Sequence, residues 1–279
     1  MDSSLEFKGY SPLKNRLYTC PNCHDTIEIE NGRFYGRCPA CQLTIIDYKP
    51  APHQVAFHKS NAKYKLNIGG FGSGKTTMNC AELARHVLTT PNGKSLITAP
   101  TLKLVKDAVL PELNKFLPPW TMTRPPALNP SPYYQFKNGH EIVVYASNDE
   151  ENLRSLNLSA FYIEEASNVD HSIFVQLQSR LRNAAALIFD ENGKEVGDKL
   201  MGLVSTNPED CWVRDEFLLK SEKIYASKSI DKEIYEKLKV KAPLKSYATF
   251  LSSSRDNVFL PKNFIRDLSA GKSPSWVKL

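Results

Sequence analysis

The sequence predicts an α/β fold with a mainly parallel central sheet flanked by helices, preceded by a small zinc ribbon. A glycine-rich loop connects a predicted strand, 64–68, to a predicted amphipathic helix, 76–88. Short apolar runs then alternate with helical segments, which is typical of a parallel sheet with crossover helices. Two C-x₂-C pairs precede all of these elements. We therefore expect an N-terminal arm at 1–17, the ribbon at 18–48 and the α/β domain at 49–279.

The length and charge of the chain limit the classes of protein to consider. Its 279 residues suffice for one large α/β domain and a small module. The net charge of +6 favours a polyanionic partner only mildly, because the charges are scattered. The first 17 residues are polar and charged, and no apolar run approaches the length of a membrane span. We expect no membrane partner and a reducing, cytosolic compartment.

Four of the six cysteines form two C-x₂-C pairs separated by 14 residues, which is close to the zinc-ribbon spacing. The predicted zinc ligands are Cys20, Cys23, Cys38 and Cys41. Four thiolates complete a tetrahedral shell, so the metal is expected to be structural and to supply the folding energy of a very small module. Disulfides are the less favoured alternative in a reducing compartment. Between the pairs, Asn31-Gly32 predicts a hairpin in which 26–30 pairs with 33–37.

After the loop, the predicted elements follow in α/β order. Strands are expected at 95–99, 133–136, 141–146, 160–163 and 200–205, helices at 102–116 and 173–181, and a turn at 190–193. Asn138-Gly139 predicts a hairpin turn between the second and third of these strands. The uninterrupted apolar run at 160–163 suits a central parallel strand. Residues 118–132 are rich in proline and are expected to be irregular.

The glycine-rich loop matches the phosphate-binding pattern G-x-x-x-x-G-K-S/T. Its residues are Gly69, Gly70, Phe71, Gly72, Ser73, Gly74, Lys75 and Thr76. A loop of this kind directs backbone N–H groups and the positive end of the helix dipole at one point, where a triphosphate fits. Lys75 is predicted to reach the β- and γ-phosphates of ATP, and Thr76 to offer its hydroxyl to Mg²⁺. Thr77 completes the predicted ATP-binding set.

Two consecutive acids end the predicted strand at 160–163. A P-loop enzyme needs an acid at the end of a neighbouring buried strand to hold the magnesium shell. Glu164 is predicted to take this role, and Glu165 to polarise the attacking water. The combination predicts a Mg²⁺-dependent ATPase of the catalytic-glutamate (ASCE) class of P-loop NTPases.

These motifs, in this order, resemble the ATPase domain of large terminase subunits, the motors that pump double-stranded DNA into tailed-phage and herpesvirus capsids. The resemblance covers roughly residues 50–270 and depends on Pro52-His53-Gln54, the P-loop, the strand end at 164–166 and the segment 202–208 with its Ser-Thr-Asn-Pro. It implies a motor that translocates DNA into a procapsid, with the portal protein and the small terminase subunit as partners. It also implies a ring-forming homo-oligomer in the cytoplasm of the infected host cell.

The resemblance also assigns roles to single residues. Gln54 is similar to the glutamine that recognises adenine. The coupling motif, which relays hydrolysis to the parts that grip DNA, corresponds to Ser205, Thr206 and Asn207. Arg154 resembles an arginine finger that acts on the neighbouring subunit, and Arg180 and Arg182 are the other candidates. Many terminases have a basic residue where this chain has Phe71, so a cation acting in cis is missing or comes from elsewhere.

Other interpretations stay open at this point. A helicase or recombination ATPase with a zinc ribbon would normally need a second RecA-like core. A non-catalytic adaptor that binds nucleotide as a switch would not need Glu165. Full-length terminases continue into an RNase H-like nuclease, and this chain stops about where that domain would begin, so we expect no DNA cleavage. The ribbon could contact the small subunit, the portal or DNA, or merely brace the N-terminus.

Overall fold

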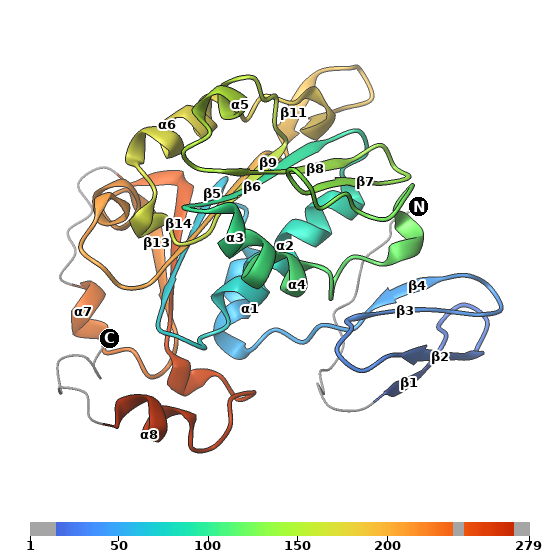
Figure 1. The fold of residues 1–279 in the computed structure, drawn as a ribbon, viewed down its shortest axis with the longest axis horizontal. Coiled ribbons are helices and arrows are strands. Elements are labelled where there is room, and N and C mark those ends of the chain that lie inside the picture. The colour runs from blue at the N-terminus through green and yellow to red at the C-terminus, as the bar shows by residue number, and fades with distance from the viewer. Residues whose placement is uncertain (1–14, 237–242, 271–279) are drawn as a thin grey trace.

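The computed structural model describes residues 15–236 and 243–270, and its centre is an eight-stranded sheet (Figure 1). The strand order is β13-β14-β5-β12-β9-β6-β8-β7, and every neighbouring pair is parallel except β7 and β8. The strands are β5 (Tyr64–Gly69), β6 (Lys94–Ala99), β7 (Tyr133–Gln135), β8 (Glu141–Ala146), β9 (Ala160–Ile163), β12 (Met201–Thr206), β13 (Ser221–Ala226) and β14 (Leu244–Ser252). Because β5, β12 and β9 are parallel neighbours, their carboxyl ends meet at one edge of the sheet.

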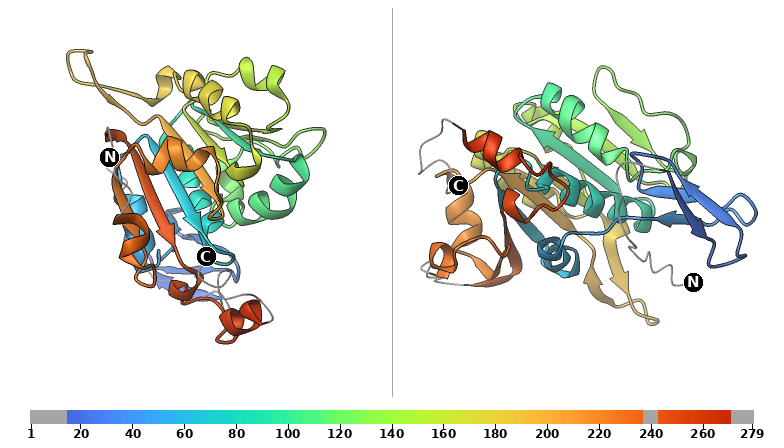
Figure 2. Two further views of the ribbon diagram at one scale, coloured as in Figure 1. Left: turned by 90° about the vertical axis from the view of Figure 1, so that its left-hand side faces the viewer. Right: turned by 90° about the horizontal axis from the view of Figure 1, so that it is seen from below.

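Helices cover both faces of this sheet (Figures 1 and 2). They are α1 (Pro52–Lys59), α2 (Lys75–Thr89), α3 (Leu102–Leu104), α4 (Leu110–Leu113), α5 (Glu150–Arg154), α6 (His171–Arg180), α7 (Lys232–Glu236) and α8 (Phe264–Ser269). Short 3₁₀ or π turns are η1 (Val105–Val109), η2 (Pro119–Thr121), η3 (Ala166–Asn168), η4 (Ala184–Ala186), η5 (Arg214–Leu218) and η6 (Ser254–Asp256). In the described ranges, none of the helices combines the length and the apolar character needed to cross a bilayer.

Two apolar cores lie on opposite faces of the sheet. Alternate residues of β9 supply them, since Tyr162 packs in the core under α2 and α4, whereas Phe161 and Ile163 pack in the core under α6. All four residues of β9 are buried, as the apolar run predicted. Burial on both faces therefore fixes the position of the strand that carries the two acids.

Most predicted elements are present with ends shifted by one or two residues. The helix predicted at 102–116 is divided into α3, the π-helical η1 and α4. Leu110 N donates to Val105 O, one residue farther back than in an α-helix, next to Pro111, which has no N–H to donate. Sequence reasoning missed α1, α7, α8, β13 and β14, although β14 pairs directly with β5.

The hairpin predicted around Asn31-Gly32 is wrong. In the ribbon, β1 (Arg16–Thr19) pairs with β2 (Thr26–Ile29), and β3 (Tyr35–Arg37) pairs with β4 (Thr44–Ile46). Each strand thus pairs across its own cysteine pair. The first strand, β1, begins inside the range predicted as an arm, and residues 1–14 of that arm lie outside the described residues.

Each cysteine pair forms its own tight turn, which explains the pairing. Cys20 N donates to Asp25 O and His24 N to Cys20 O; in the other turn, Cys38 N donates to Leu43 O and Gln42 N to Cys38 O. His24 and Gln42 occupy matching positions and both have a left-handed φ, of 62° and 64°. The two knuckles are therefore the hairpin turns, and the chain between β2 and β3 is a connection.

The ribbon is packed against the α/β domain at the end of α4 (Figure 2). Phe34 N donates to Lys115 O (2.8 Å), and the Phe34 ring stacks on Phe116 with centroids 4.3 Å apart. Trp120 Nε1 donates to Thr44 Oγ1 (2.9 Å). These contacts join the ribbon to the proline-rich segment, which is irregular apart from η2 and two isolated bridges to the β7 region.

Candidate nucleotide site and cysteine centre

The predicted P-loop joins β5 to α2, as the sequence pattern requires. Gly72 and Gly74 have φ of 73° and 86°, a region that side-chain-bearing residues rarely adopt. A Cβ on Gly69 would lie 2.5 Å from both Ser252 O and Ser73 Oγ, so only glycine fits there. Gly74 is the N-cap of α2, and the first backbone N–H groups of that helix point towards the loop. The loop therefore has the shape and polarity of an anion site.

Lys75 lies across the inside of the loop. Its Nζ donates to Gly69 O (2.5 Å), Gly70 O (3.1 Å) and Asn207 Oδ1 (3.1 Å). Burial lowers the pKa of Lys75, and the nearby carboxylates of Glu164 and Glu165 oppose that shift. The three oxygens hold an ammonium group that a phosphate could draw away from them.

Glu164 lies at the end of β9, opposite the start of α2. Its Oε1 accepts from Thr76 Oγ1 (3.0 Å), and its Oε2 accepts from Ser205 Oγ (2.5 Å) and from the hydroxyl of Tyr162. Paired hydroxyl and carboxylate oxygens are the ligands that Mg²⁺ takes in P-loop enzymes. Thr76 and Glu164 thus fit the predicted magnesium role. The hydroxyl of Thr77 instead donates to Glu112 Oε1 of α4 (2.7 Å), away from the loop.

Glu165 has an unusual backbone and an available carboxylate. Its φ of 51° is left-handed, which strains a residue with a side chain. Burial raises its pKa, and Glu164 and Glu209 raise it further. Among the described residues, none forms a hydrogen bond or an ion pair with this carboxylate. A base for the attacking water would have these properties.

The predicted coupling residues lie at the end of β12, between the P-loop strand and the acidic strand. Ser205 contacts Glu164, and Asn207 contacts Lys75, as given above. Thr206 Oγ1 accepts from Ser167 N (3.2 Å), just beyond Glu165. One strand end therefore touches both halves of the site.

Gln54 is buried near the start of α1 and reaches the end of the P-loop. Its Oε1 accepts from Ala51 N (2.8 Å) and from the Tyr48 hydroxyl (3.0 Å), and its Nε2 donates to Gly74 O (3.5 Å). The amide thus caps α1 and contacts the loop. Its oxygen is already paired within the chain.

The structure does not bring the arginine candidates to the P-loop. Arg154 is 67% exposed on α5 and pairs with Glu150 Oε2 (2.6 Å). Arg180 ends α6 and Arg182 follows it, and both form backbone hydrogen bonds with Leu158, which precedes β9 at the opposite edge of the sheet from the P-loop.

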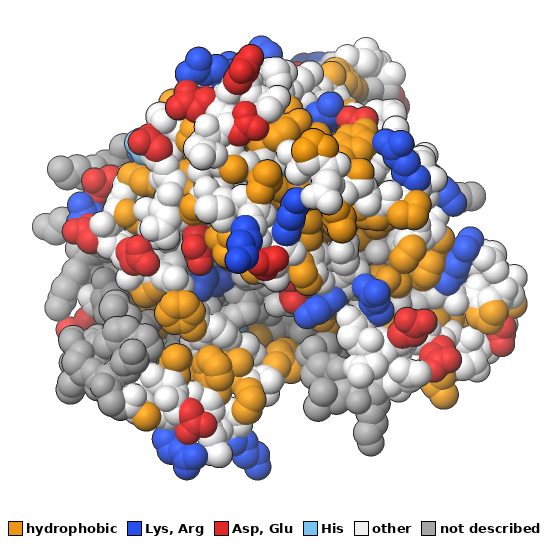
Figure 3. Space-filling model, viewed as in Figure 1, with side chains coloured by type: hydrophobic (Ala, Val, Ile, Leu, Met, Phe, Trp, Pro, Cys, Tyr) orange, Lys and Arg blue, Asp and Glu red, His pale blue; other side chains and the backbone are white. Residues whose placement is uncertain are grey.

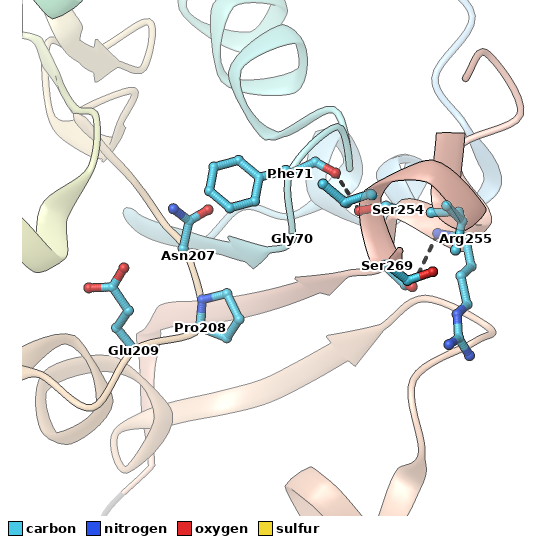
Figure 4. Close-up of a pocket in the computed structure, with 11 residues that line it drawn as sticks. Gly70, Phe71, Asn207, Pro208, Glu209, Ser254, Arg255 and Ser269 are labelled. Atoms are coloured by element: carbon cyan, nitrogen blue, oxygen red, sulfur yellow. Dashed lines mark hydrogen bonds between the residues drawn. The ribbon is translucent and has the colours of Figure 1, made fainter. Parts of the chain in front are cut away.

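Sequence reasoning missed the contribution of the segment after β14, which packs on the P-loop (Figure 4). Ser254 Oγ donates to Phe71 O (2.5 Å) and Asn257 Nδ2 to Gly72 O (2.6 Å). A cavity of about 250 Å³ lies between the loop and α8. It is lined by Gly70, Phe71, Asn207, Arg255, Ile265 and Leu268, among others. Phe71 is 57% exposed, and Arg255 is the one lysine or arginine among the described residues that line this cavity.

The four predicted zinc ligands converge in the ribbon. Their sulfur atoms all lie within 4.8 Å of one another, with Cys20 and Cys41 3.5 Å apart and Cys23 and Cys38 3.4 Å apart. Zinc–sulfur bonds of about 2.3 Å place the sulfurs of a tetrahedral site about 3.8 Å apart. The cluster therefore fits a Cys₄ metal site.

Comparison with known proteins agrees with this geometry. A family model described as the phage terminase large subunit matches residues 61–274. The PBSX phage terminase large subunit of Bacillus subtilis (strain 168) is 25% identical over 213 residues. That alignment covers 75% of this chain and 46% of the relative, so the chain spans about half the length of the curated relative it matches.

Solved structures have the same fold. A large terminase from a thermophilic bacteriophage has a TM-score of 0.60 at 13% identity, over 82% of this chain and 52% of that one. The large terminase ATPase domain of Thermus phage P74-26 has a TM-score of 0.56 at 16% identity, over 83% and 92%. A structure of the former protein in complex with ATP-gamma-S has a TM-score of 0.57 at 11% identity, over 82% and 51%. At these identities the likeness concerns the fold alone.

Proposed function

The chain belongs to the phage terminase large subunit family, and from this premise we propose that it is an ATP-hydrolysing motor domain that drives double-stranded DNA into a procapsid. The observation that carries the proposal is the end of β12. There, Asn207 contacts Lys75 of the P-loop and Ser205 contacts Glu164 of the acidic strand. A strand that touches both the phosphate-binding and the metal-binding side can respond to hydrolysis on either.

Each residue of the site has a distinct task in this proposal. On ATP binding, Lys75 leaves Gly69, Gly70 and Asn207 and takes the β- and γ-phosphates. Thr76 and Glu164 would hold Mg²⁺, which neutralises charge on those phosphates. Glu165 accepts the proton of the attacking water, and its raised pKa suits that task. Asn207 then loses its bond to Lys75 whenever nucleotide is bound, so its position reports the state of the site.

We propose that a second copy of the chain completes the site. Among the described residues, Lys75 is the cation that contacts the P-loop backbone, and Phe71 offers no charge where the loop turns. Arg154 is exposed and could act on a neighbouring subunit in a ring. Such an arginine neutralises the charge of the phosphoryl transition state. The portal protein, the small terminase subunit and DNA are the partners of this proposed ring, in the cytoplasm of the infected host cell.

We also propose a structural role for zinc in the ribbon. Cys20, Cys23, Cys38 and Cys41 would hold it with no open position for water. Among the described residues, the separate core of the ribbon consists of Cys20, Ile27 and Cys38, whereas its other buried rings, such as Phe34 and Tyr35, pack in a core of the domain. Measuring bound zinc in the purified protein, and its loss in Cys38→Ser, tests this directly.

Steady-state ATP turnover against protein concentration tests the main proposal. The assay is run with linear duplex, with single-stranded DNA and without DNA, and Lys75→Ala is the blank. We expect turnover per subunit to rise with concentration and with duplex. Preference for single strands would favour a helicase instead. ATP binding without turnover above the blank, in every condition, would indicate a nucleotide switch and reject the motor.

A further inference from the structure

The junction between the ribbon and the α/β domain is hollowed on its surface. Two adjoining hollows, of about 320 Å³ and about 500 Å³, share Arg33, Tyr35, Pro119 and Trp120 in their linings. We call the two together the ribbon trough. Lysine and arginine side chains lie on both sides of the junction on the face shown in Figure 3. The ribbon forms one wall, and the proline-rich segment with the β7 region forms the other.

Basic residues outnumber acidic ones in the trough, and the larger hollow carries only positive charge. Arg33, Arg124 and Lys137 line the larger hollow, and its lining contains neither Asp nor Glu. Arg37 lines the smaller hollow, where Glu28 and Glu30 lie on the ribbon side. Among the described residues, none of Arg37, Arg124 and Lys137 forms an ion pair, whereas many other surface cations of the chain do. Three exposed cations are thus available for an outside anion.

Aromatic rings hold the arginines of the trough in place. The Arg37 guanidinium lies 5.6 Å from the ring centroid of Trp120, and that of Arg124 lies 5.9 Å from the ring of Tyr133. Arg33 lies 5.8 Å from the ring of Tyr35, and its Nη1 also donates to Asn114 O (3.0 Å). Stacking orients a guanidinium and leaves its N–H donors free, which suits recognition of phosphate. Arg37 and Arg124 are therefore positioned before any ligand arrives.

The same rings are poorly placed to stack on nucleobases. Trp120 donates its indole N–H to Thr44, meets the edge of Tyr35 at 5.3 Å, and has Arg37 over its ring. Tyr35 is itself buried. Proteins that hold single strands need open aromatic faces. The trough instead offers phosphate contacts alone, which act on either strand of a duplex without reading its sequence.

We propose that the ribbon trough binds the phosphate backbone of duplex DNA through Arg37, Arg124 and Lys137. The choice of DNA as the anion rests on the proposed function, whereas the location rests on the charge and geometry of the trough. The ribbon wall lies before residue 61, outside the part of the chain that the family model matches. The hydrogen bonds of Phe34 with Lys115 and of Trp120 with Thr44 join the ribbon to the domain and give this surface a fixed orientation relative to the ATP site.

Binding of a short fluorescein-labelled duplex, followed by anisotropy against salt without ATP, tests the proposal. The test variant is the full chain with Arg37→Gln, Arg124→Gln and Lys137→Gln. The matched control carries Lys223→Gln, Lys228→Gln and Lys232→Gln, three exposed cations near the opposite edge of the sheet. We expect the test variant to bind at least about ten-fold more weakly and its log–log salt slope to fall by about three, with the control close to wild type.

Several outcomes would overturn the proposal that the trough binds duplex DNA. Equal weakening of test and control variants would mean that only net charge matters. If polyglutamate binding is weakened by the three substitutions and duplex binding is not, the trough binds an acidic protein partner instead. Unchanged thermal unfolding and ATP binding show that the test variant is folded. If duplex binding depends on the three cations but the protein shows no ATP turnover, only the proposed motor is rejected. If the test variant binds duplex as tightly as wild type and keeps its duplex-stimulated turnover, only the trough is rejected.

Discussion

The P-loop region and the ribbon are held in shape by different interactions. The P-loop region depends on three parallel strand ends, which bring Lys75, Glu164 and Asn207 together although they are far apart in the sequence. The ribbon has two short hairpins, a cysteine cluster and a few aromatic contacts with the domain. The sheet can therefore hold the nucleotide site ready without a ligand, whereas the ribbon is expected to depend on the metal proposed for its cysteine cluster. The predictions that follow separate these two kinds of stability.

Removal of zinc should have the largest effect, and it should be confined to the ribbon. Structural zinc contributes on the order of 10 kcal/mol to modules of this type. We expect a strong chelator, or Cys38→Ser, to unfold the ribbon and change the fluorescence of Trp120, which packs on Tyr35 and Thr44. Far-UV circular dichroism of the sheet and ATP binding should persist. In Trp120→Phe the fluorescence change should vanish, and cooperative loss of the sheet would contradict the prediction.

Glu165→Gln should give the next largest effect, on the nucleotide site alone. Loss of a general base lowers turnover roughly 10²- to 10⁴-fold, about 3–5 kcal/mol of barrier. Because glutamine has nearly the same shape, ATP affinity and the temperature of unfolding should change little. Glu191→Gln, an exposed acid in the turn between β10 (Leu187–Phe189) and β11 (Glu195–Asp198), is the matched control. Turnover above one tenth of wild type in Glu165→Gln would remove this residue from the proposed mechanism.

The α/β domain should lose stability below about pH 6.5 because it buries two histidines, one in α2 and one just before β8. His86 donates to Ser159 Oγ (3.0 Å), and His140 Nδ1 donates to Thr90 O (2.7 Å). Burial lowers the pKa of both, and that of His86 to about 3. The unfolded chain therefore binds more protons, so stability is full above the unfolded pKa of about 6.5 and is lost as pH falls from there towards the folded pKa.

The expected size of this loss is about 2 kcal/mol for His86 by pH 5. Urea unfolding of the wild type and of His86→Phe at pH 7.5 and pH 5 measures it. Any loss of zinc at the lower pH affects both proteins equally, so it cancels in the comparison. The variant should be less stable at pH 7.5 but lose less on acidification. Parallel losses in the two proteins would mean that His86 does not titrate on unfolding.

Local signals in the sequence predicted the P-loop and the acidic strand well, because both are short and their chemistry is set by neighbouring residues. Gly72 and Gly74 mark positive φ, and the apolar run of β9 marks burial on both faces. The place of β14 could not be predicted in this way. Its residues mix charged, small and aromatic side chains, and its place between β13 and β5 follows from pairing with the distant β5. The contacts of Ser254 and Asn257 with the P-loop follow from that pairing.

In the ribbon, a correct local signal gave the wrong partner. Asn31-Gly32 does turn the chain, with Gly32 at a φ of 76°, but the strands on either side pair elsewhere. The cysteine knuckles close hairpins of their own through the N–H groups of Cys20 and Cys38. The convergence of the four sulfurs thus determines the strand pairing more strongly than the favourable Asn31-Gly32 turn does. The spacing of the cysteines predicted the cluster but not the strand pairing around it.

The smallest predicted effect concerns the side chain that joins the two regions. Thr77, one residue after the predicted magnesium ligand, donates to Glu112, which also pairs with Lys115 (2.5 Å). The carbonyl of Lys115 in turn accepts from Phe34 of the ribbon. Thr77→Val keeps the shape and removes one hydrogen bond to a carboxylate, so we expect about 1 kcal/mol less stability.

The same substitution tests whether the Thr77 hydroxyl contacts the bound nucleotide. If its hydroxyl only ties α2 to α4, ATP affinity should stay within about two-fold of wild type, since a backbone N–H contact with phosphate survives the change. Thr89→Val is the control, because Thr89 Oγ1 bonds only Arg85 O within α2. A clear loss of ATP affinity in Thr77→Val, absent from the control, would mean that the hydroxyl leaves Glu112 for the nucleotide. The hydrogen bond between Thr77 of α2 and Glu112 of α4 would then break each time nucleotide binds. The nucleotide site and the ribbon would be coupled through this one hydrogen bond.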